Sequence, residues 1–163
     1  DAGAIDAASI ERAVATASPA VITPHAGELA RLLERERSAV ADAPLEAARD
    51  AAAQFGVVVL LKGHTTRAVA PGGDIVTAQS APAWLATAGA GDALGGVLGA
   101  LLASRADDLA TDPDRALLTR LAAGAAVIHG LAAERASGGG PLTVLDLCAA
   151  ISPVIAELVA GRE

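Results

Sequence analysis

The chain has 163 residues and a formal net charge of -7, and this length fits one compact core but is too short for two ordinary domains. The acidic balance, without a stretch rich in Lys and Arg, excludes the basic surface that nucleic-acid binding requires. Gly, Asp, Arg or His interrupts the apolar runs before they reach the roughly 20 residues of a membrane span, so no membrane partner is expected.

The N-terminal part of the chain predicts a short strand followed by two helices. Val21 and Ile22 form the strand, which ends at Thr23-Pro24-His25. The segment GELARLLERERSAV at 27–40 then continues as one helix. A second helix covers 44–55 and ends at Gly56, a residue suited to a left-handed C-terminal cap.

The middle of the chain predicts three strands. The continuous apolar run from Val57 to Leu61 is typical of a strand that is buried on both faces of a parallel sheet covered by helices. RAVA at 67–70 and DIVTA at 74–78 are short extended segments, and the turn-forming residues Pro71-Gly72-Gly73-Asp74 connect them. We therefore expect a hairpin after the buried strand.

Helices dominate the remainder of the chain. TAGAGD at 87–92 is a Gly-rich loop, and a helix rich in small residues follows from Ala93. Two more helices are predicted at about 114–136 and about 143–160, with the surface loop SGGGP at 137–141 between them. Alternating strands and helices of this kind predict an α/β fold.

The TAGAGD loop is the first candidate for chemistry. Gly89, Ala90 and Gly91 lie where a flexible backbone meets a helix start, so their N–H groups can converge on a phosphate with the help of the helix dipole. Asp92 is either a capping charge for that helix or a base that takes a proton from an attacking hydroxyl. The loop has neither the GK[ST] of a Walker A motif nor the GxGxxG of a dinucleotide fold.

Polar residues also follow the predicted strands, at the carboxyl ends where open α/β sheets bind ligands. Five of them come directly after the buried strand: Lys62, Gly63, His64, Thr65 and Thr66. They are either contacts to a nucleotide or a solvated lysine with ordinary turn hydroxyls. His25 is either a ligand contact or a histidine that caps a helix or packs a loop.

The remaining histidine and the single cysteine give no sign of a metal site or a disulfide. His129, flanked by apolar residues in AAVIHGLAA, reads as a packed core histidine or a polar contact between helices. The His residues and Cys148 have no zinc-ligand spacing, so no protein metal site is expected. A single cysteine also excludes an intramolecular disulfide and suits a reducing cytoplasm.

Five segments in order resemble the ADP- or ATP-dependent NAD(P)H-hydrate dehydratase family. They are VITPHAGELARLL at 21–33, VVVLLKGHTT at 57–66, LATAGAGDALGGVLGALLA at 85–103, VIHGLAAERAS at 127–137 and LTVLDLCAAI at 142–151. The resemblance implies a ribokinase-like fold, a three-layer α/β/α sandwich with a mostly parallel central sheet. It also implies a cytoplasmic homo-oligomer that repairs hydrated NADH or NADPH, with ADP or ATP as co-substrate and Mg²⁺.

The same resemblance implies roles for the candidate residues. His25 of TPHxGE and Asp92 of GAGD would contact the hydrated nicotinamide nucleotide, and Asp92 would assist phosphate transfer to the ring hydroxyl. The segment Lys62 to Thr66, together with Gly91, would bind the adenine nucleotide. N–H groups at 89–92 would stabilise charge on the transferring phosphoryl group.

The chain departs from the family in two respects. The family usually has Lys-Gly-small-Gly-Thr where this chain has Lys62 to Thr66, so altered phosphate or ribose contacts are expected there. Its catalytic domain is also considerably longer, and Asp1-Ala2-Gly3-Ala4-Ile5 resembles a segment from the middle of that domain. Residues 1–163 are therefore expected to be the C-terminal portion of a single domain, with an open sheet edge and weak or absent activity alone.

Two other functions remain open at this point. A ribokinase-like small-molecule kinase would also use GAGD before a helix of small residues, although TPHxGE argues against it. A non-catalytic nucleotide-binding fragment is compatible with an incomplete domain.

Overall fold

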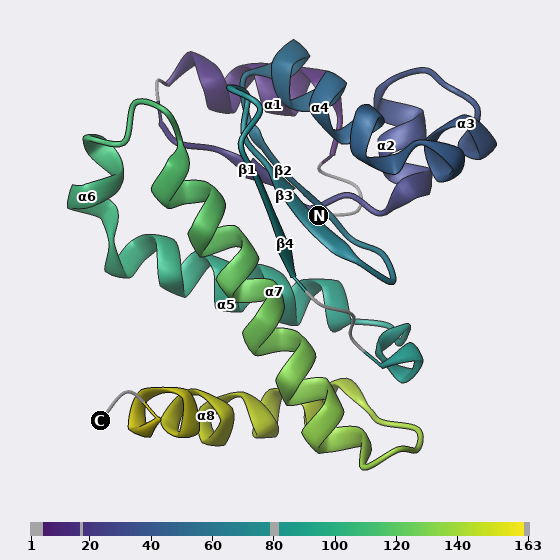
Figure 1. The fold of residues 1–163 in the computed structure, drawn as a ribbon, viewed down its shortest axis with the longest axis vertical. Helices are drawn as coiled ribbons and strands as arrows, with labels where there is room; N and C mark the ends of the chain where they lie inside the picture. The colour runs from purple at the N-terminus through teal and green to yellow at the C-terminus, as the bar shows by residue number, and fades with distance from the viewer. Residues whose placement is uncertain (1–4, 17, 79–81, 162–163) are drawn as a thin grey trace.

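The computed structural model describes residues 5–16, 18–78 and 82–161, so residues 1–4, on which most of the expected mid-domain segment falls, lie outside it. Four described strands form a sheet in the order β1-β2-β3-β4. Their bounds are β1 Val21–Ile22, β2 Val58–Leu61, β3 Thr66–Val69 and β4 Ile75–Ala78. Figure 1 shows the strands at the centre of the upper part of the molecule.

The pairing of the strands divides the sheet into two parts. β1 pairs with β2 in parallel, with Val21 opposite Val58, whereas the β2–β3 and β3–β4 pairs are antiparallel. Parallel pairing among the described strands is therefore confined to β1 and β2. Short connections, residues 62–65 between β2 and β3 and the turn through Gly73 (φ +96°) between β3 and β4, return the chain directly and produce the antiparallel pairs. The β3–β4 pair confirms the predicted hairpin.

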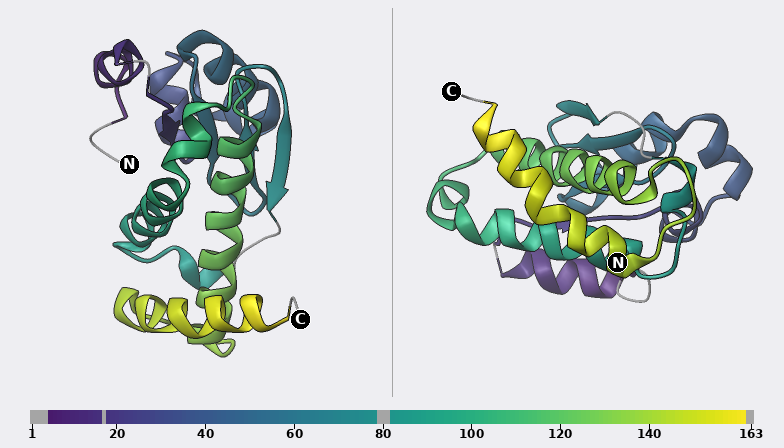
Figure 2. Two further views of the ribbon diagram at one scale, coloured as in Figure 1. Left: turned by 90° about the vertical axis from the view of Figure 1, so that its left-hand side faces the viewer. Right: turned by 90° about the horizontal axis from the view of Figure 1, so that it is seen from below.

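The residues of β2 divide the core into two layers. Val58 and Leu60 pack in a cluster with residues of α5 (Ala90–Ser104) and α7 (Ala116–Ser137). Val59 and Leu61 pack on the opposite face, with residues of α4 (Pro44–Phe55). Since every residue of β2 is buried, the strand is covered by helices on both faces, as predicted. Figure 2 shows this three-layer α/β/α arrangement from two further sides.

The helices before β2 differ from the prediction in one respect. The single helix expected over 27–40 is wrong, because the chain forms α2 (Ala26–Leu32) and α3 (Arg37–Asp42). Glu34 has φ +53°, and the N–H groups of Glu34 and Arg35 donate to the carbonyls of Arg31 and Ala30. These two bonds form a Schellman motif that ends α2. A further helix, α1 (Ala7–Ala15), was not predicted; Asp6 caps it.

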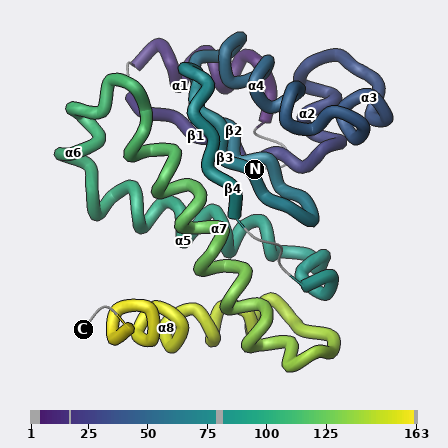
Figure 3. The backbone as a smooth tube through the Cα atoms, viewed as in Figure 1, coloured from purple at the N-terminus to yellow at the C-terminus, as the bar shows by residue number. Residues whose placement is uncertain are grey.

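The C-terminal helices follow the prediction closely. α7 and α8 (Val144–Ala160) match the two expected segments, and a turn containing Gly138 and Gly139 separates them. α5 begins at Ala90 instead of Ala93, so the second half of TAGAGD is already helical. The short helices α6 (Ala106–Ala110) and η2 (Ala83–Leu85) were not predicted. In the tube of Figure 3, α7 runs from α6 past the strands to α8, which crosses its far end.

By length and composition, α7 is the one helix among the described residues that could cross a membrane. Half of its most apolar window is buried, and the helix packs against β3, β4, α5 and α8. Its apolar residues Leu118, Ala122 and Ala125 lie in the same buried cluster as Val58 and Leu60 of β2. The hydropathy of α7 therefore follows from its place in the core.

Candidate active-site cleft

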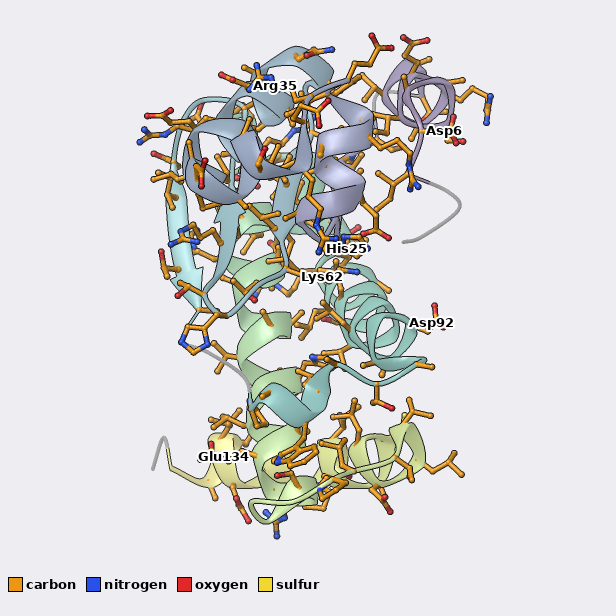
Figure 4. The ribbon with its side chains drawn as sticks, turned by 90° about the vertical axis from the view of Figure 1, so that its right-hand side faces the viewer. Asp6, His25, Arg35, Lys62, Asp92 and Glu134 are labelled. Atoms are coloured by element: carbon orange, nitrogen blue, oxygen red, sulfur yellow. The ribbon has the colours of Figure 1, made fainter. Side chains whose placement is uncertain are left out.

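Two strand ends bring His25 and Lys62 together. β1 and β2 are parallel neighbours, so the segments that follow them leave the sheet at the same edge. The N–H of Lys62 donates to the carbonyl of Pro24 at 2.8 Å, and His25 and Lys62 form a parallel bridge. Figure 4 shows the two side chains close together at this edge.

The ring of His25 caps α2. Its Nδ1 accepts hydrogen bonds from the N–H groups of Gly27 at 3.0 Å and Glu28 at 3.1 Å. The Glu28 carboxylate in turn accepts from the N–H of His25 at 2.7 Å, which completes a capping box. The interpretation of His25 as a helix-capping histidine is therefore confirmed, and the ring remains exposed at the edge of the cleft.

Glu28 is a buried acid that the sequence analysis did not select. Its side chain is 8% exposed, and its Oε2 lies 3.8 Å from Nζ of Lys62, which is 23% exposed. Burial lowers the pKa of Lys62, and the negative charges of Glu28 and Asp92 partly offset that effect. The His-x-x-Glu spacing at the start of a helix is the signal that could have identified Glu28.

The third part of the site is the first turn of α5. Gly89 is the N-cap residue and has φ +85°, a left-handed conformation that favours glycine. A Cβ atom at Gly89 would also lie 3.2 Å from Cγ2 of Val144 at the start of α8. The first N–H groups of an α-helix have no carbonyl partner within the helix, so this turn presents donors to an anion.

His129 connects this turn to α7. Its Nε2 lies 2.8 Å from the carbonyl oxygen of Ala90, and the residue is 6% exposed. Burial lowers the pKa of His129; the bond to Ala90 raises it and the positive charge of Lys62 lowers it further. The sequence left open a packed core histidine or a polar contact between helices; the burial of His129 and its contact with Ala90 confirm both.

A cleft of about 580 Å³ joins these parts. Its lining consists of His25, Lys62, Gly63, His64, Thr66, Pro82, Ala83, Leu85, Ala86, Thr87, Ala90, Gly91, Leu94, Ala126 and His129. Most of the candidate residues thus line one cavity, which combines the ammonium of Lys62 and backbone groups with the apolar residues Pro82, Leu85, Leu94 and Ala126. Such a cavity suits a ligand with an anionic part and a flat apolar part.

Three candidate residues do not line the cleft: Thr65, Gly89 and Asp92. Asp92 lies in the first turn of α5 and is exposed. In Figure 4 its carboxylate points outward from α5, away from the side chains of His25 and Lys62. Gly89 supports the cleft through the backbone, as the residue that allows the turn before Ala90.

The sequence analysis did not select the apolar wall. Pro82, Leu85, Leu94 and Ala126 come from three separate segments, and none carries a charge or a hydrogen-bonding side chain that would mark it. Only folding brings them beside Lys62. A Pro-containing stretch between a hairpin and a Gly-rich loop is a weak signal for such a wall.

Within the described part of the chain, no group of three His, Cys, Asp or Glu side chains is arranged to hold a metal ion. Mg²⁺ usually keeps several water ligands and binds through one or two carboxylates plus the phosphates of a substrate. The cleft therefore fits a magnesium ion that arrives with nucleotide phosphates better than one held in a protein cage.

Comparisons of the sequence with known proteins point to one family. A family profile described as NAD(P)H-hydrate dehydratase matches residues 1–155. The chain is 46% identical over 83 residues to the ADP-dependent (S)-NAD(P)H-hydrate dehydratase of Neisseria meningitidis, an alignment that covers 51% of this chain and 28% of that protein.

Solved structures show the same fold. The ADP/ATP-dependent NAD(P)H-hydrate dehydratase from Bacillus subtilis, co-crystallized with ATP/Mg²⁺, superimposes with a TM-score of 0.70 at 26% identity, over 85% of this chain and 48% of that chain. A ribokinase-like superfamily protein from Enterococcus faecalis superimposes with a TM-score of 0.63 at 20% identity, over 92% of this chain and 52% of that chain. The predicted ribokinase-like α/β fold is confirmed.

The chain spans about half the length of the solved relatives, and its alignment with the Neisseria protein covers 28% of that protein. The profile, by contrast, covers residues 1–155, which is nearly all of this chain. On that match, supported by the fold, the chain belongs to the NAD(P)H-hydrate dehydratase family.

Proposed function

We propose that this chain carries the nucleotide-binding side of an ADP- or ATP-dependent NAD(P)H-hydrate dehydratase, which restores NADH or NADPH from their hydrated forms. The observation that supports this most is the cleft in which the strand-end residues His25 and Lys62 meet the first turn of α5. The relatives are named for this reaction, and one was co-crystallized with ATP/Mg²⁺.

The proposed roles are those that the family resemblance implies, and three of the residues, Thr65, Gly89 and Asp92, lie outside the lining of the cleft. Lys62, Gly63, His64, Thr65, Thr66 and Gly91 contact the adenine nucleotide. The N–H groups of the Gly89-Ala90-Gly91 turn stabilise charge on the transferring phosphoryl group, because a helix N-terminus favours an anion. His25 and Asp92 contact the hydrated nicotinamide nucleotide beside that turn.

The proposed reaction uses phosphate as a better leaving group than hydroxide. Asp92 accepts the proton of the ring hydroxyl while the hydroxyl oxygen attacks the terminal phosphorus of ADP, and AMP departs with the electrons of the broken P–O bond. Phosphate then leaves the ring with the C–O electrons, and loss of a ring proton restores the double bond. The products are NADH or NADPH, AMP and phosphate; with ATP, ADP replaces AMP.

Magnesium has a limited place in this proposal. When bound with the nucleotide, Mg²⁺ would neutralise phosphate charge, and the chain itself contributes Lys62 and the α5 turn as positive or polar groups. The partly buried ammonium of Lys62 lies beside Glu28 in the lining of the cleft.

The direct test is recovery of reduced-nicotinamide absorbance when hydrated NADPH and ADP are incubated with a full-length protein containing this chain. Asp92→Asn should abolish recovery without changing the fold, whereas Asp114→Asn, at an exposed position before α7, should leave it unchanged. Absence of recovery in the full-length protein would refute the proposal. A phosphorylated alcohol without dehydration would identify a kinase, and ADP binding that survives Asp92→Ala without turnover would identify a non-catalytic binding module.

The domain, the oligomeric state and the cellular compartment of the complete protein are also part of the proposal. We infer that residues 1–163 are the C-terminal portion of one ribokinase-like domain and that the complete protein is a cytoplasmic homo-oligomer. The two-residue strand β1 lies at the edge of the described sheet, which favours pairing with additional chain. Light scattering of the full-length protein measures the oligomer; a monomer at all concentrations would contradict that part.

A further inference from the structure

His129 is a buried side chain that makes one hydrogen bond between α7 and α5. It lies within α7, is 6% exposed, and places Nε2 2.8 Å from the carbonyl oxygen of Ala90 in α5. A carbonyl oxygen can only accept, so Nε2 carries the hydrogen in this bond and the neutral ring has its lone pair on Nδ1.

The bonded carbonyl belongs to the same planar peptide group as the N–H of Gly91. In an α-helix the carbonyl and the N–H of one peptide point in opposite directions along the axis, and N–H groups point toward the N-terminus. A donor that holds the Ala90 oxygen therefore fixes the direction of the Gly91 N–H. Gly91 lines the cleft, on the side where the first turn of α5 is open to an anion.

The bond also changes the strength of that N–H as a donor. Hydrogen bonds that share one peptide group polarise each other, because electron density drawn toward the oxygen leaves the N–H more positive. Burial keeps the imidazole neutral by lowering the pKa of His129, and Lys62 acts in the same direction. The ring thus supports the turn without placing a second cation beside Lys62.

We propose that His129 is a positioning residue for the phosphate of a nucleoside diphosphate, acting through the Ala90–Gly91 peptide. The inference rests on the nucleotide site of the proposed function, but not on dehydration. It predicts a selective effect: loss of the Nε2–H weakens binding of the phosphate part and leaves binding of the nucleoside part unchanged.

Calorimetric titration of the 163-residue chain with ADP and with adenosine tests this selectivity. His129→Leu removes the donor and should weaken ADP binding roughly 3- to 10-fold while adenosine binding stays the same. His129→Gln retains an N–H at a similar reach and should recover most of the ADP affinity. If the leucine variant does not fold, His129→Asn replaces it, because the shorter amide does not reach Ala90.

The amide resonance of Gly91 gives a second readout that needs no ligand. In His129→Leu its proton should move upfield, as expected for a less polarised N–H, and in His129→Gln it should stay close to its original position. Equal ADP affinity in all variants would overturn the inference. So would equal losses for ADP and adenosine, or ADP binding no tighter than adenosine binding in the unaltered chain. A selective loss in this chain, combined with no dehydratase activity in the full-length protein, would refute the proposed function and leave this inference standing.

Discussion

The carboxylate of Glu28 joins two segments that are 34 residues apart in the chain, since Lys62 follows β2 and Glu28 lies in the first turn of α2. One of its oxygens accepts the N–H of His25 and also faces the ammonium of Lys62. A buried acid with both partners is stable, whereas removal of the acid takes a negative charge away from the partly buried ammonium of Lys62. Glu28 therefore supports the helix start and holds Lys62 at the cleft.

We predict that Glu28→Ala lowers the free energy of unfolding by about 3 kcal/mol, because it removes a capping bond and a buried negative charge beside the ammonium of Lys62. Glu28→Gln keeps an acceptor for the N–H of His25 and should cost about half as much. Urea denaturation measures both. Glu11→Ala, at an exposed position on α1, is the matched control and should change stability by less than about 0.5 kcal/mol. Similar losses at positions 11 and 28 would contradict the role of Glu28.

His129 makes stability depend on pH in a defined direction. Its pKa in the folded chain is lowered from 6.5, mainly by burial. As the pH falls below 6.5, the unfolded chain takes up a proton that the folded chain does not, so the free energy of unfolding decreases until the pH reaches the lowered pKa. Above 6.5 the ring is neutral in both states and contributes no pH dependence.

The corresponding prediction compares the unaltered chain with His129→Gln. Between about pH 8 and about pH 5.5 the variant should lose less stability, because its side chain takes up no proton in either state. Contributions common to both proteins cancel in the difference, which thermal or urea unfolding at several pH values provides. Parallel curves for the two proteins would show that His129 titrates alike in the folded and unfolded chains.

At the scale of the element, the start of α5 depends on a glycine for two independent reasons. Gly89 has φ +85°, and an added Cβ would lie 3.2 Å from a methyl group of Val144. Gly95, further along the same helix, has open space around an added Cβ. The two positions therefore respond to the same substitution in opposite directions.

We predict that Gly89→Ala destabilises the chain by about 1 to 3 kcal/mol and weakens ADP binding, because the turn before Ala90 must shift. Gly95→Ala should stabilise the chain by about 0.5 to 1 kcal/mol, since alanine favours the helix interior. Adding Val144→Ala to Gly89→Ala should recover only the steric part of the loss. Chemical denaturation and ADP titration of the variants test this; a neutral Gly89→Ala would mean that the turn adapts without strain.

Elements were predictable from the sequence where local signals agree. Gly56 and the apolar run after it give the end of α4 and the buried strand β2. The break after α2 was missed because Glu34, and not glycine, occupies the left-handed position. The first turn of α5 was read as loop because its glycines have low helix propensity, whereas contact with α8 and His129 holds it as helix.

The residues of the candidate site were likewise predictable only where a local sequence pattern marks them. Strand-end position indicated His25 and Lys62, and the Gly-rich motif indicated the α5 turn. Glu28 and the apolar wall depend on tertiary contacts, which one-dimensional patterns do not encode. The outward direction of Asp92 could not be derived from the motif either, because it depends on how α5 lies against the sheet.

At the scale of the whole molecule, the described residues line the proposed nucleotide side of the cleft but leave Asp92 exposed to water. Its lining comes from the segments after β1 and β2, from η2 and from α5 and α7, while Asp92 lies exposed beyond it. A substrate that contacts Asp92 would face water in this chain. Phosphoryl transfer depends on held geometry and exclusion of water, so both conditions are incomplete around that carboxylate.

We therefore predict that the 163-residue chain binds ADP but dehydrates hydrated NADPH on the order of 100-fold or more slowly than the Neisseria relative assayed in parallel. Circular dichroism and ADP titration of the same sample establish that the chain is folded and occupied, so that low turnover is not a folding defect. Extending the chain to full length should restore the rate, because added structure would pair the edge of β1 and enclose Asp92. Turnover by the isolated chain equal to that of the relative would contradict this, and would mean that substrate reaches Asp92 in productive geometry without a further wall.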